Sequence, residues 1–394
     1  MTVAPGTLPA ALRTAASTHG DRPAVVDGDR TLSFVQLLDE VRRTAAGFAA
    51  LGLEPGGRVC VWAPNSVDWM IAGLAATYAG GTLVPVNSRY TGHEAQDIAD
   101  RTSAQIFVVA NGFLGRDQVA EVRAAGDLPL LKAFVTLPGS TPADGATVFA
   151  ALAGLGTGHD VEVRADLVSP DDVADVLFTS GTTGRAKGAM SAHRQTIAVS
   201  AAWAEIGGVT AEDRYLVVNP FFHSFGYKIG IVVGLLTGCT LYPVATFDLD
   251  GVMSTIQDER ISVLPGAPTI FTSLLDAPDR GDFDLSSLRL SITGAAVVPV
   301  VLIERMRAAA PEGLGIDNVY TAFGMTEAVV ATMCRDGDSA DLVANTCGRA
   351  IPGMEARIGE QDELLLRGAY VMLGYLDDPE ATREAIDEDG WLHT

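Results

Sequence analysis

Apolar residues recur along this chain with two alternating spacings, and this alternation limits the available folds more than any other feature. Helical spacing runs through "LSFVQLLDEVRRTAAGFAALG" (32–52), and the continuous apolar run "RVCVWA" (58–63) that follows is typical of a buried strand. Similar pairs continue to residue 110 and resume after residue 172. Strands that alternate with helices predict parallel sheets with helices on their faces, which is an α/β fold.

The remaining expected elements share these two patterns. Helices are expected over 66–80, 91–102, 191–207, 226–238, 248–260 and 299–310, and strands over 83–86, 104–110, 175–180, 214–219, 239–244, 261–266 and 288–294. Beyond residue 345 only short strand patterns remain, at 355–359 and 363–368.

The length of 394 residues indicates more than one subdomain, because a single hydrophobic core stops growing at about 250–300 residues. Residues 137–172 are rich in Gly, Pro, Ala and Asp and read as a loose connection. We therefore expect an N-terminal α/β subdomain over 1–168, a second α/β subdomain over 169–344 and a small β-rich subdomain over 345–394.

Charge and composition exclude several classes of function. A net charge of −22 argues against a polyanionic partner such as nucleic acid, which needs a basic surface. The stretch 67–86 is nearly long enough to span a bilayer, but Gly80 and Gly81 divide it into a helix pattern and a strand pattern. Because the N-terminus also lacks a signal peptide, we expect a cytoplasmic protein without a transmembrane segment.

The four cysteines, Cys60, Cys239, Cys334 and Cys347, show no metal-ligand spacing. Cys60 and Cys239 lie in strand-like apolar stretches. We therefore interpret the cysteines as reduced core thiols.

The segment "TSGTTGRAKG" (179–188) follows a predicted buried strand and has the composition of a phosphate-binding loop. Its glycines let backbone N–H groups turn toward an anion, and its hydroxyls add donors. It also holds Lys187, one of only three lysines beside 24 arginines. A lysine is a compact charge on a flexible stem, which suits a phosphate that shifts during a reaction. We expect the next helix to begin near Ser191 and to point its positive N-terminus at the same anion.

The loop is not the common nucleotide-binding pattern, because Lys187 follows Ala186 and precedes Gly188. The bland alternative is a flexible surface loop, which would need no lysine. Instead, the segment resembles the phosphate loop of the adenylate-forming superfamily, which includes acyl-CoA synthetases, luciferases and the adenylation domains of peptide synthetases.

Further motifs strengthen the resemblance, and they occur in the family's order. "VYTAFGMTEA" (319–328) resembles the aromatic-Gly-x-Thr-Glu signature, in which a ring stacks on adenine, a threonine contacts phosphate and a glutamate binds Mg²⁺. The family usually has tyrosine where this chain has Phe323. "SITGAAVVP" (291–299) resembles the segment beside the adenine, and "NPFFHSFGY" (219–227) and "VLPGAPTIF" (263–271) resemble walls of the acyl pocket. For His223, a histidine bonded to a backbone carbonyl is the structural alternative.

The resemblance implies a set of site residues. The implied catalytic residues are Lys187, Thr326, Glu327 and His223. The implied cofactor-binding residues are Thr179, Ser180, Gly181, Thr182, Thr183, Gly184, Lys187, Gly294, Ala295, Ala296, Tyr320, Phe323, Gly324 and Thr326. The acyl pocket would comprise Phe221, Phe222, His223, Gly266, Pro268 and Met325, and Glu327 and Thr183 would hold the metal.

The stretch 363–394 resembles the end of the family's large domain. Relatives continue with an aspartate that binds ribose, a hinge and a C-terminal domain that carries a catalytic lysine. We therefore expect residues 169–344 to bind the nucleotide, the mobile C-terminal domain to be missing from this chain, and the chain alone to be a poor catalyst.

The implied activity is that of an acyl-CoA synthetase, which uses ATP, Mg²⁺ and coenzyme A. The stretches "PFFHSFGYK", "TGAAVVPVVLIERM" and "TCGR" resemble actinobacterial synthetases for steroid-derived propanoates, so a bulky alicyclic or terpenoid-like acid is the expected substrate. Medium- or long-chain fatty acids, loading of a carrier protein, a relative that performs only the thioester-forming half-reaction and a nucleotide-sensing module are the alternatives. A homodimer is left open.

Overall fold

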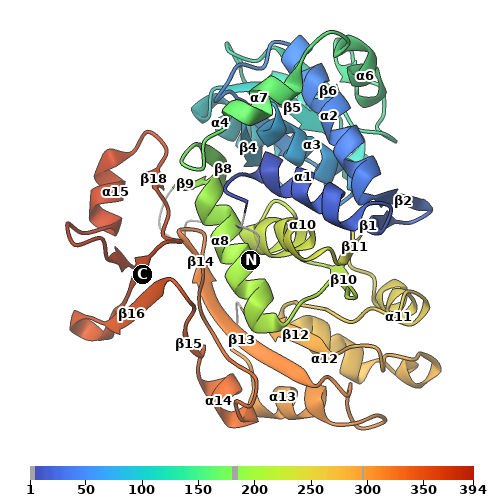
Figure 1. The fold of residues 1–394 in the computed structure, drawn as a ribbon, viewed down its shortest axis with the longest axis vertical. Helices are drawn as coiled ribbons and strands as arrows, with labels where there is room; N and C mark the ends of the chain where they lie inside the picture. Colours follow the sequence, from blue (N-terminus) through green and yellow to red (C-terminus); the bar gives the residue numbers. More distant parts are fainter. Residues whose placement is uncertain (1–4, 180–184, 295–296) are drawn as a thin grey trace.

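The computed structural model of the protein describes residues 5–179, 185–294 and 297–394. It contains two large sheets with helices packed on their faces, and a third, small sheet to one side (Figure 1). The expected α/β class is confirmed, with mainly parallel pairing inside the large sheets.

The first large sheet has eight strands in the order β18-β9-β8-β4-β3-β5-β6-β7. The strands from β8 to β7 are parallel, whereas β9 and β18 are antiparallel to their neighbours. Their bounds are β3 Arg58–Trp62, β4 Thr82–Pro85, β5 Ala104–Val109, β6 Ala133–Thr136, β7 Thr147–Val148, β8 Val173–Phe178, β9 Gly188–Ala192 and β18 Gly374–Tyr375.

The second large sheet consists of two four-stranded parts, β10-β11-β1-β2 and β12-β13-β14-β15. The segment 261–266, expected as a strand, forms only isolated bridges, but these bridges connect β10 to β12. The bounds are β1 Pro23–Asp27, β2 Arg30–Ser33, β10 Arg214–Val217, β11 Thr240–Pro243, β12 Leu290–Thr293, β13 Asn318–Met325, β14 Ala328–Met333 and β15 Arg349–Ala350.

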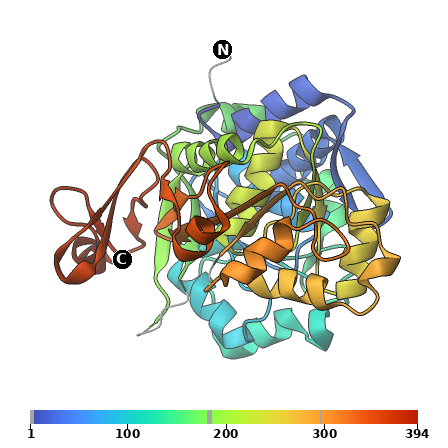
Figure 2. The same cartoon turned by 90° about the horizontal axis from the view of Figure 1, so that it is seen from below.

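The small antiparallel sheet contains β16 Met354–Ile358, β17 Leu364–Gly368 and β19 Leu392–His393. It belongs to the C-terminal segment, which projects from the two larger sheets in both views (Figures 1 and 2).

The sheets cross both of the expected boundaries. Strand β1 of the first segment pairs with β11 of the second, and β8 and β9 of the second segment complete the sheet of the first. Likewise, β15 and β18, which lie after residue 344, pair with β14 and β9. Backbone hydrogen bonds connect strands on both sides of residues 168 and 344. The divisions at these residues therefore stay predictions about which parts of the chain fold as units.

The helices begin where side chains can cap them. Ser33 and Gln36 form a reciprocal capping box at the start of α2, and Thr91 and Glu94 do the same for α4. The helices are α1 Leu8–His19, α2 Phe34–Ala50, α3 Val67–Tyr78, α4 Gly92–Arg101, α5 Gln118–Ala125, α6 Leu152–Leu155, α7 Val161–Leu167, α8 His193–Gly207, α9 Ser224–Gly226, α10 Val233–Thr237, α11 Leu249–Asp258, α12 Pro268–Asp276, α13 Val300–Arg307, α14 Ala340–Asn345 and α15 Pro379–Ala385, together with the π-helix η3 Tyr227–Val232.

The core is continuous between the two large sheets. One buried cluster takes side chains from both sheets and from α1, α2, α3 and α8, while a second covers the opposite face of the first sheet with α4 and α5. Helix α3 is buried on nearly every side, which explains why its sequence is apolar throughout. It is followed by strand β4, as the sequence predicts for 67–86. Within the described residues, no helix is both long and apolar enough to cross a membrane.

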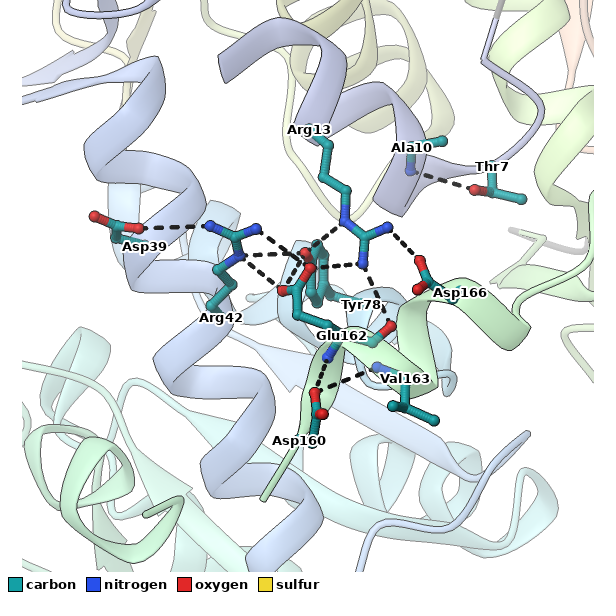
Figure 3. A network of polar contacts seen from close by, with 10 residues as sticks. All are labelled: Thr7, Ala10, Arg13, Asp39, Arg42, Tyr78, Asp160, Glu162, Val163 and Asp166. Atoms are coloured by element: carbon teal, nitrogen blue, oxygen red, sulfur yellow. Dashed lines mark hydrogen bonds and ion pairs between the residues drawn. The ribbon is translucent and has the colours of Figure 1, made fainter. Parts of the chain in front are cut away.

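Polar contacts hold the loose segment before residue 172 to the helices (Figure 3). Glu162 of α7 pairs with Arg13 of α1 and Arg42 of α2, each at 2.8 Å, and it accepts a hydrogen bond from the Tyr78 hydroxyl at 2.7 Å. Desolvation is the largest single influence on the Glu162 carboxyl and raises its pKa. The hydrogen bonds and charges of Arg42, Tyr78 and Arg13 together outweigh it, so the pKa of the carboxyl is lowered overall. The carboxylate therefore joins four helices at one point.

The cysteines are free thiols, and three of the four are buried. Burial raises the pKa of the Cys60 and Cys239 thiols to about 12. Cys347 is exposed, so the core interpretation is wrong for that residue.

Candidate active site

The candidate phosphate loop connects β8 to β9 as a hairpin. At its base, the Thr179 N–H donates to the Lys187 carbonyl at 2.9 Å, and the Lys187 N–H donates to Thr179 Oγ1 at 3.2 Å. The predicted loop residues Ser180, Gly181, Thr182, Thr183 and Gly184 lie outside the described residues.

The expected contribution of the next helix to this loop is wrong. Strand β9 separates the loop from α8, which begins at His193. Five strand residues span about 17 Å, so the N-terminus of α8 lies at the other end of the hairpin from the loop. The helix dipole therefore does not act on an anion held by the loop, since its effect falls off within the first turn.

Helix α4 supplies a contact with the loop that the sequence did not predict. Its Asp97 pairs with Arg185, and its Arg101 donates to the Ala186 carbonyl at 2.7 Å. These contacts fix the chain immediately before Lys187.

Lys187 and Glu327 meet at a third side chain, Tyr375. The Lys187 Nζ lies 4.9 Å from the centroid of the Tyr375 ring, and the Tyr375 hydroxyl donates to Glu327 Oε1 at 2.7 Å. Glu327 and Tyr375 are buried, and Lys187 is half-buried. Burial, followed by the bond to Glu327, raises the pKa of Tyr375, so the phenol stays protonated and can donate.

Glu327 lies in the two-residue turn between β13 and β14, where Met325 pairs with Ala328. The Met372 N–H donates to its carbonyl at 2.7 Å, so both its main chain and its side chain are held by the segment 372–375. The alternative that this motif is a loop ending in an exposed glutamate is therefore wrong.

Most of the other predicted nucleotide residues that the structure describes lie near the ends of β12 and β13, and Tyr320 lies apart from them. Gly294 follows β12 and lies beside Ala322 of β13, so it is next to Phe323 at the same end of these strands. Gly324 is exposed, and a Cβ there would lie 2.4 Å from the Val330 backbone nitrogen. Glycine is thus required by the approach of β14. Thr326 is half-buried in the turn beside Glu327. Ala295 and Ala296 lie outside the described residues.

Tyr320 does not join this group. It is 3% exposed, belongs to the core and donates its hydroxyl to Asn318 Oδ1 at 3.1 Å. It stands three residues before Phe323 and on the other face of the strand, because side chains alternate. The nucleotide contact of Tyr320 stays a prediction, and the burial of its ring in the core does not support it.

The segments that are predicted to line the acyl pocket contact neighbouring strands and one another. The Asn219 side chain donates to the Pro265 carbonyl at 3.0 Å, and the Gly266 N–H donates to the Ile292 carbonyl at 3.0 Å. Pro268 is the first residue of α12, a position that suits its fixed φ. Phe222 and Met325 are partly exposed, whereas Phe221 is buried against Trp69, with ring centroids 5.3 Å apart. Phe221 is therefore a core residue in this structure, and its role as a pocket wall stays a prediction.

His223 caps the short helix α9. Its Nδ1 accepts a hydrogen bond from the Phe225 N–H at 3.1 Å, so the neutral ring carries its proton on Nε2. Among the described residues, no carbonyl accepts a hydrogen bond from this ring, so the structure does not support the alternative of a histidine bonded to a carbonyl. The side chain is exposed, yet surrounding protein desolvates it enough to lower its pKa. It can therefore present a neutral N–H donor to an incoming group.

A cavity of about 400 Å³ lies elsewhere. Its lining includes Arg58, Thr82 and Val173, the first residues of three parallel strands, whereas the loop follows the last residue of β8. None of the predicted site residues lines it. In the described part of the chain, no group of three or more His, Cys, Asp or Glu side chains could hold a metal by itself.

Three contributors escaped sequence reasoning. Tyr375 lies 48 residues beyond Glu327 in the chain, and Asp97 lies 88 residues before Arg185. Asn65 accepts from the Phe221 N–H at 2.6 Å and so fixes the start of the His223 segment. Their local sequences carry no signal for these contacts, which depend on strand order.

Known proteins resemble the chain over nearly its whole length. Residues 12–376 match the family model described as AMP-binding enzyme. The chain is 54% identical over 403 residues to a (7a-methyl-1,5-dioxo-octahydro-1H-inden-4-yl)propanoyl:CoA ligase of Rhodococcus jostii, with 100% of this chain and 77% of the relative covered. It is 51% identical to the ligase of the same name from Mycobacterium tuberculosis, with 98% and 76% covered.

Solved structures share the fold. An inhibitor-bound N-terminal domain of FACL13 from Mycobacterium tuberculosis has a TM-score of 0.85 at 25% identity, with 98% of this chain and 95% of that chain covered. An ATP-bound RpMatB-BxBclM chimera has a TM-score of 0.83 at 26% identity, with 99% and 75% covered.

Proposed function

Because the chain belongs to the AMP-binding enzyme family, we propose that it is an acyl-CoA synthetase. In this reaction a carboxylate attacks the α-phosphorus of ATP, which gives an acyl-adenylate and pyrophosphate. The thiol of CoA then attacks the acyl carbon and displaces AMP. The observation that supports the proposal is the convergence of Lys187 and Glu327 on Tyr375, which brings a cation and a carboxylate together at the base of the β8–β9 hairpin.

The first step brings two anions together, so the site must neutralise charge as well as align the reactants. Lys187 is half-buried at the end of the loop, and its ammonium is the group that would follow the β- and γ-phosphates. His223 would orient the carboxylate of the acid through its Nε2–H, because its Nδ1 is already engaged by the helix.

The residues present fit one Mg²⁺ that arrives with the nucleotide. Glu327 offers a hard carboxylate, and the structure records no hydrogen bond from the described residues to its second oxygen. Mg²⁺ is commonly held by one or two carboxylates together with substrate phosphates, which one glutamate satisfies. When bound there, the ion would offset charge on the phosphates. Thr183, the other proposed ligand, lies outside the described residues.

The names of the two relatives indicate a class of acid. Both are ligases for a bicyclic dioxo propanoate. At more than 50% identity over nearly the whole chain, we propose that this protein also acts on bulky alicyclic propanoates. A cytoplasmic location and a homodimer stay predictions.

The test is acid-dependent ATP–pyrophosphate exchange by the full-length protein, with bicyclic propanoates and linear fatty acids side by side. We expect exchange with the bicyclic acids at the higher kcat/KM, followed by AMP release that depends on CoA. Glu327→Gln should abolish exchange, whereas Glu384→Gln, an exposed change in α15, should leave it intact.

Each other result has a distinct meaning. Faster exchange with linear acids would assign a fatty acyl-CoA synthetase. Exchange without CoA-dependent AMP release would favour a carrier-protein acceptor. If the protein binds a stable acyl-adenylate analogue but shows no exchange, this would indicate an enzyme that catalyses only the thioester-forming half-reaction. If the protein showed no exchange and did not bind the analogue, the proposal would be contradicted.

A further inference from the structure

Tyr375 stands between the two charged residues that the proposed reaction needs, and it contacts each of them with a different part of its side chain. Its hydroxyl donates to Glu327 Oε1 at 2.7 Å, while its ring faces the Lys187 ammonium at 4.9 Å. We propose that Tyr375 is a positioning residue that orients Glu327 toward the metal and holds Lys187 beside the phosphates. This inference rests on the proposed function.

The backbone around Tyr375 is fixed independently of either partner. Tyr375 pairs with Ala189 in the antiparallel β18–β9 ladder, and its N–H donates to Thr382 Oγ1 at 2.9 Å. The next residue, Leu376, donates to the Gly188 carbonyl at 2.8 Å. A ring mounted on such a backbone has a defined position before any ligand arrives.

The hydroxyl contact determines which oxygen of Glu327 stays available. Oε1 is occupied by the phenol, and the Glu327 main chain is held by Met372 and by the bridge between Ala328 and Val371. With both ends of the residue fixed, the carboxylate has little freedom to rotate. Oε2 is then the oxygen left for a cation.

The ring contact acts on the lysine. An ammonium within about 6 Å of a ring centroid is attracted to the ring face, and the attraction is stronger where water is partly excluded. Lys187 is half-buried and lies two residues before the β9 partner of Tyr375. The ring thus gives the long lysine side chain a resting position at the end of the phosphate loop.

Two separable effects follow. Loss of the hydroxyl alone removes only the contact that orients Glu327, so it should weaken metal binding and leave the lysine in place. Loss of the whole ring should also weaken phosphate binding, because the lysine then samples more rotamers. Tyr370 provides a matched control, since its hydroxyl also donates to one acceptor, the Pro352 carbonyl, at 2.5 Å in the same segment.

The experiment compares the full-length wild type with Tyr375→Phe, Tyr375→Leu and Tyr370→Phe. Electron paramagnetic resonance measures binding of Mn²⁺ in the presence of ATP, and calorimetry measures binding of pyrophosphate without metal. We expect Tyr375→Phe to weaken Mn²⁺ binding about tenfold, the usual effect of losing a hydrogen bond to a charged group, and to leave pyrophosphate affinity within about twofold. Tyr375→Leu should weaken both, and Tyr370→Phe neither.

A double-mutant cycle keeps the proposal testable if a single variant changes the fold. Because the hydroxyl is proposed to act through Glu327, Tyr375→Phe should have no further effect on Mn²⁺ binding in a Glu327→Gln background. Unchanged Mn²⁺ binding by Tyr375→Phe, or an equal effect in both backgrounds, would overturn the inference. If the wild type shows no acid-dependent exchange, the proposed function fails, whereas exchange by the wild type with no effect of Tyr375→Phe on metal binding refutes only the role of Tyr375.

Discussion

His193 shows what burial does to a single titratable group. It is 1% exposed at the start of α8, and its Nδ1 accepts a hydrogen bond from the Leu8 N–H at 3.2 Å. Desolvation lowers its pKa to about 4, although Asp172 opposes the shift. The ring is therefore neutral at pH 7, and it links the N-terminal helix to the sheet that carries the candidate phosphate loop.

A neutral buried histidine makes stability depend on pH. Its folded pKa lies below the unfolded value of about 6.5, so the unfolded chain binds the proton first as the pH falls. The free energy of unfolding should thus decrease between pH 6.5 and about 4, and this contribution should stay constant at lower pH.

Urea unfolding at pH 7.5 and pH 5.0 measures this effect. Between pH 7.5 and pH 5.0, the free energy of unfolding of the wild type should fall by about 2 kcal/mol more than that of His193→Gln, because glutamine cannot titrate. The exposed His159→Gln is the control and should behave as the wild type. An equal loss in His193→Gln and the wild type would contradict the assignment.

At the scale of elements, the π-helix η3 is tied to the first sheet by a buried ion pair. Lys228 Nζ lies 3.0 Å from Asp175 Oδ1 of β8 and donates to Ser191 Oγ of β9 at 2.8 Å. Thr196 of α8 donates to the other carboxylate oxygen of Asp175 at 2.8 Å. The sequence predicts one regular helix over 226–238, but a π-helical turn occupies 227–232. Such turns are frequent at functional sites, and this one follows the His223 segment.

Breaking this pair from one side should be costly. Lys228→Met leaves the Asp175 carboxylate buried without its cation, and we expect a loss of about 3–5 kcal/mol in the free energy of unfolding. The double variant Lys228→Met/Asp175→Leu should recover most of that loss, because no unpaired charge then remains. Chemical denaturation of both variants measures the difference.

Arg43→Met is the comparison for an exposed pair. Arg43 contacts Glu40 at 2.9 Å on the surface of α2, where an ion pair contributes less than about 1 kcal/mol. A Lys228→Met variant as stable as Arg43→Met would show that the buried pair contributes little.

At the scale of the whole molecule, segments distant in sequence complete one another's sheets. Strand β1 lies between β2 and β11, and β4 lies between β3 and β8. The larger core also takes side chains from both sheets. The N-terminal 168 residues therefore lack the neighbours of two of their strands and part of their core.

A fragment of residues 1–168 tests this dependence. We expect it to lack cooperative unfolding and to expose apolar surface, seen as binding of a hydrophobic dye, whereas residues 1–394 should unfold cooperatively. The exposed edges of β1 and β4 should also make the fragment prone to aggregate. A stable fragment with a sharp thermal transition would support a folding boundary at residue 168.

The sequence identified the elements with strong local patterns, but it missed others, among them α1, β1, β2, β13 and β14. The helix pattern at 91–102 corresponds to α4 at Gly92–Arg101, and the strand pattern at 104–110 to β5 at Ala104–Val109. It missed β9, because the short segment 188–192 of small residues has neither a strong apolar run nor an alternation. That omission led directly to the mistaken placement of a helix N-terminus at the phosphate loop.

The sequence predicted the part of the site whose charged residues occur within short motifs. The loop composition singled out Lys187, and the 319–328 motif singled out Glu327, but neither motif contains the residue that joins them. Tyr320 illustrates a limit of such motifs, because a motif names residue types and does not say which face of a strand they occupy. Orientation depends on register and on the neighbouring strands.

The sequence by itself determined the α/β class, the order of the helices and strands with strong periodicity, and the types of side chain available for phosphate and metal. Helix and strand periodicity, glycine content and side-chain charge are properties of neighbouring residues, so they can be read without the fold. Only the tertiary structure decided that β18 pairs with β9, that Tyr375 separates Lys187 from Glu327, and that the sheets cross the expected boundaries. These contacts join residues far apart in the chain and depend on packing of the whole core, which no local pattern encodes.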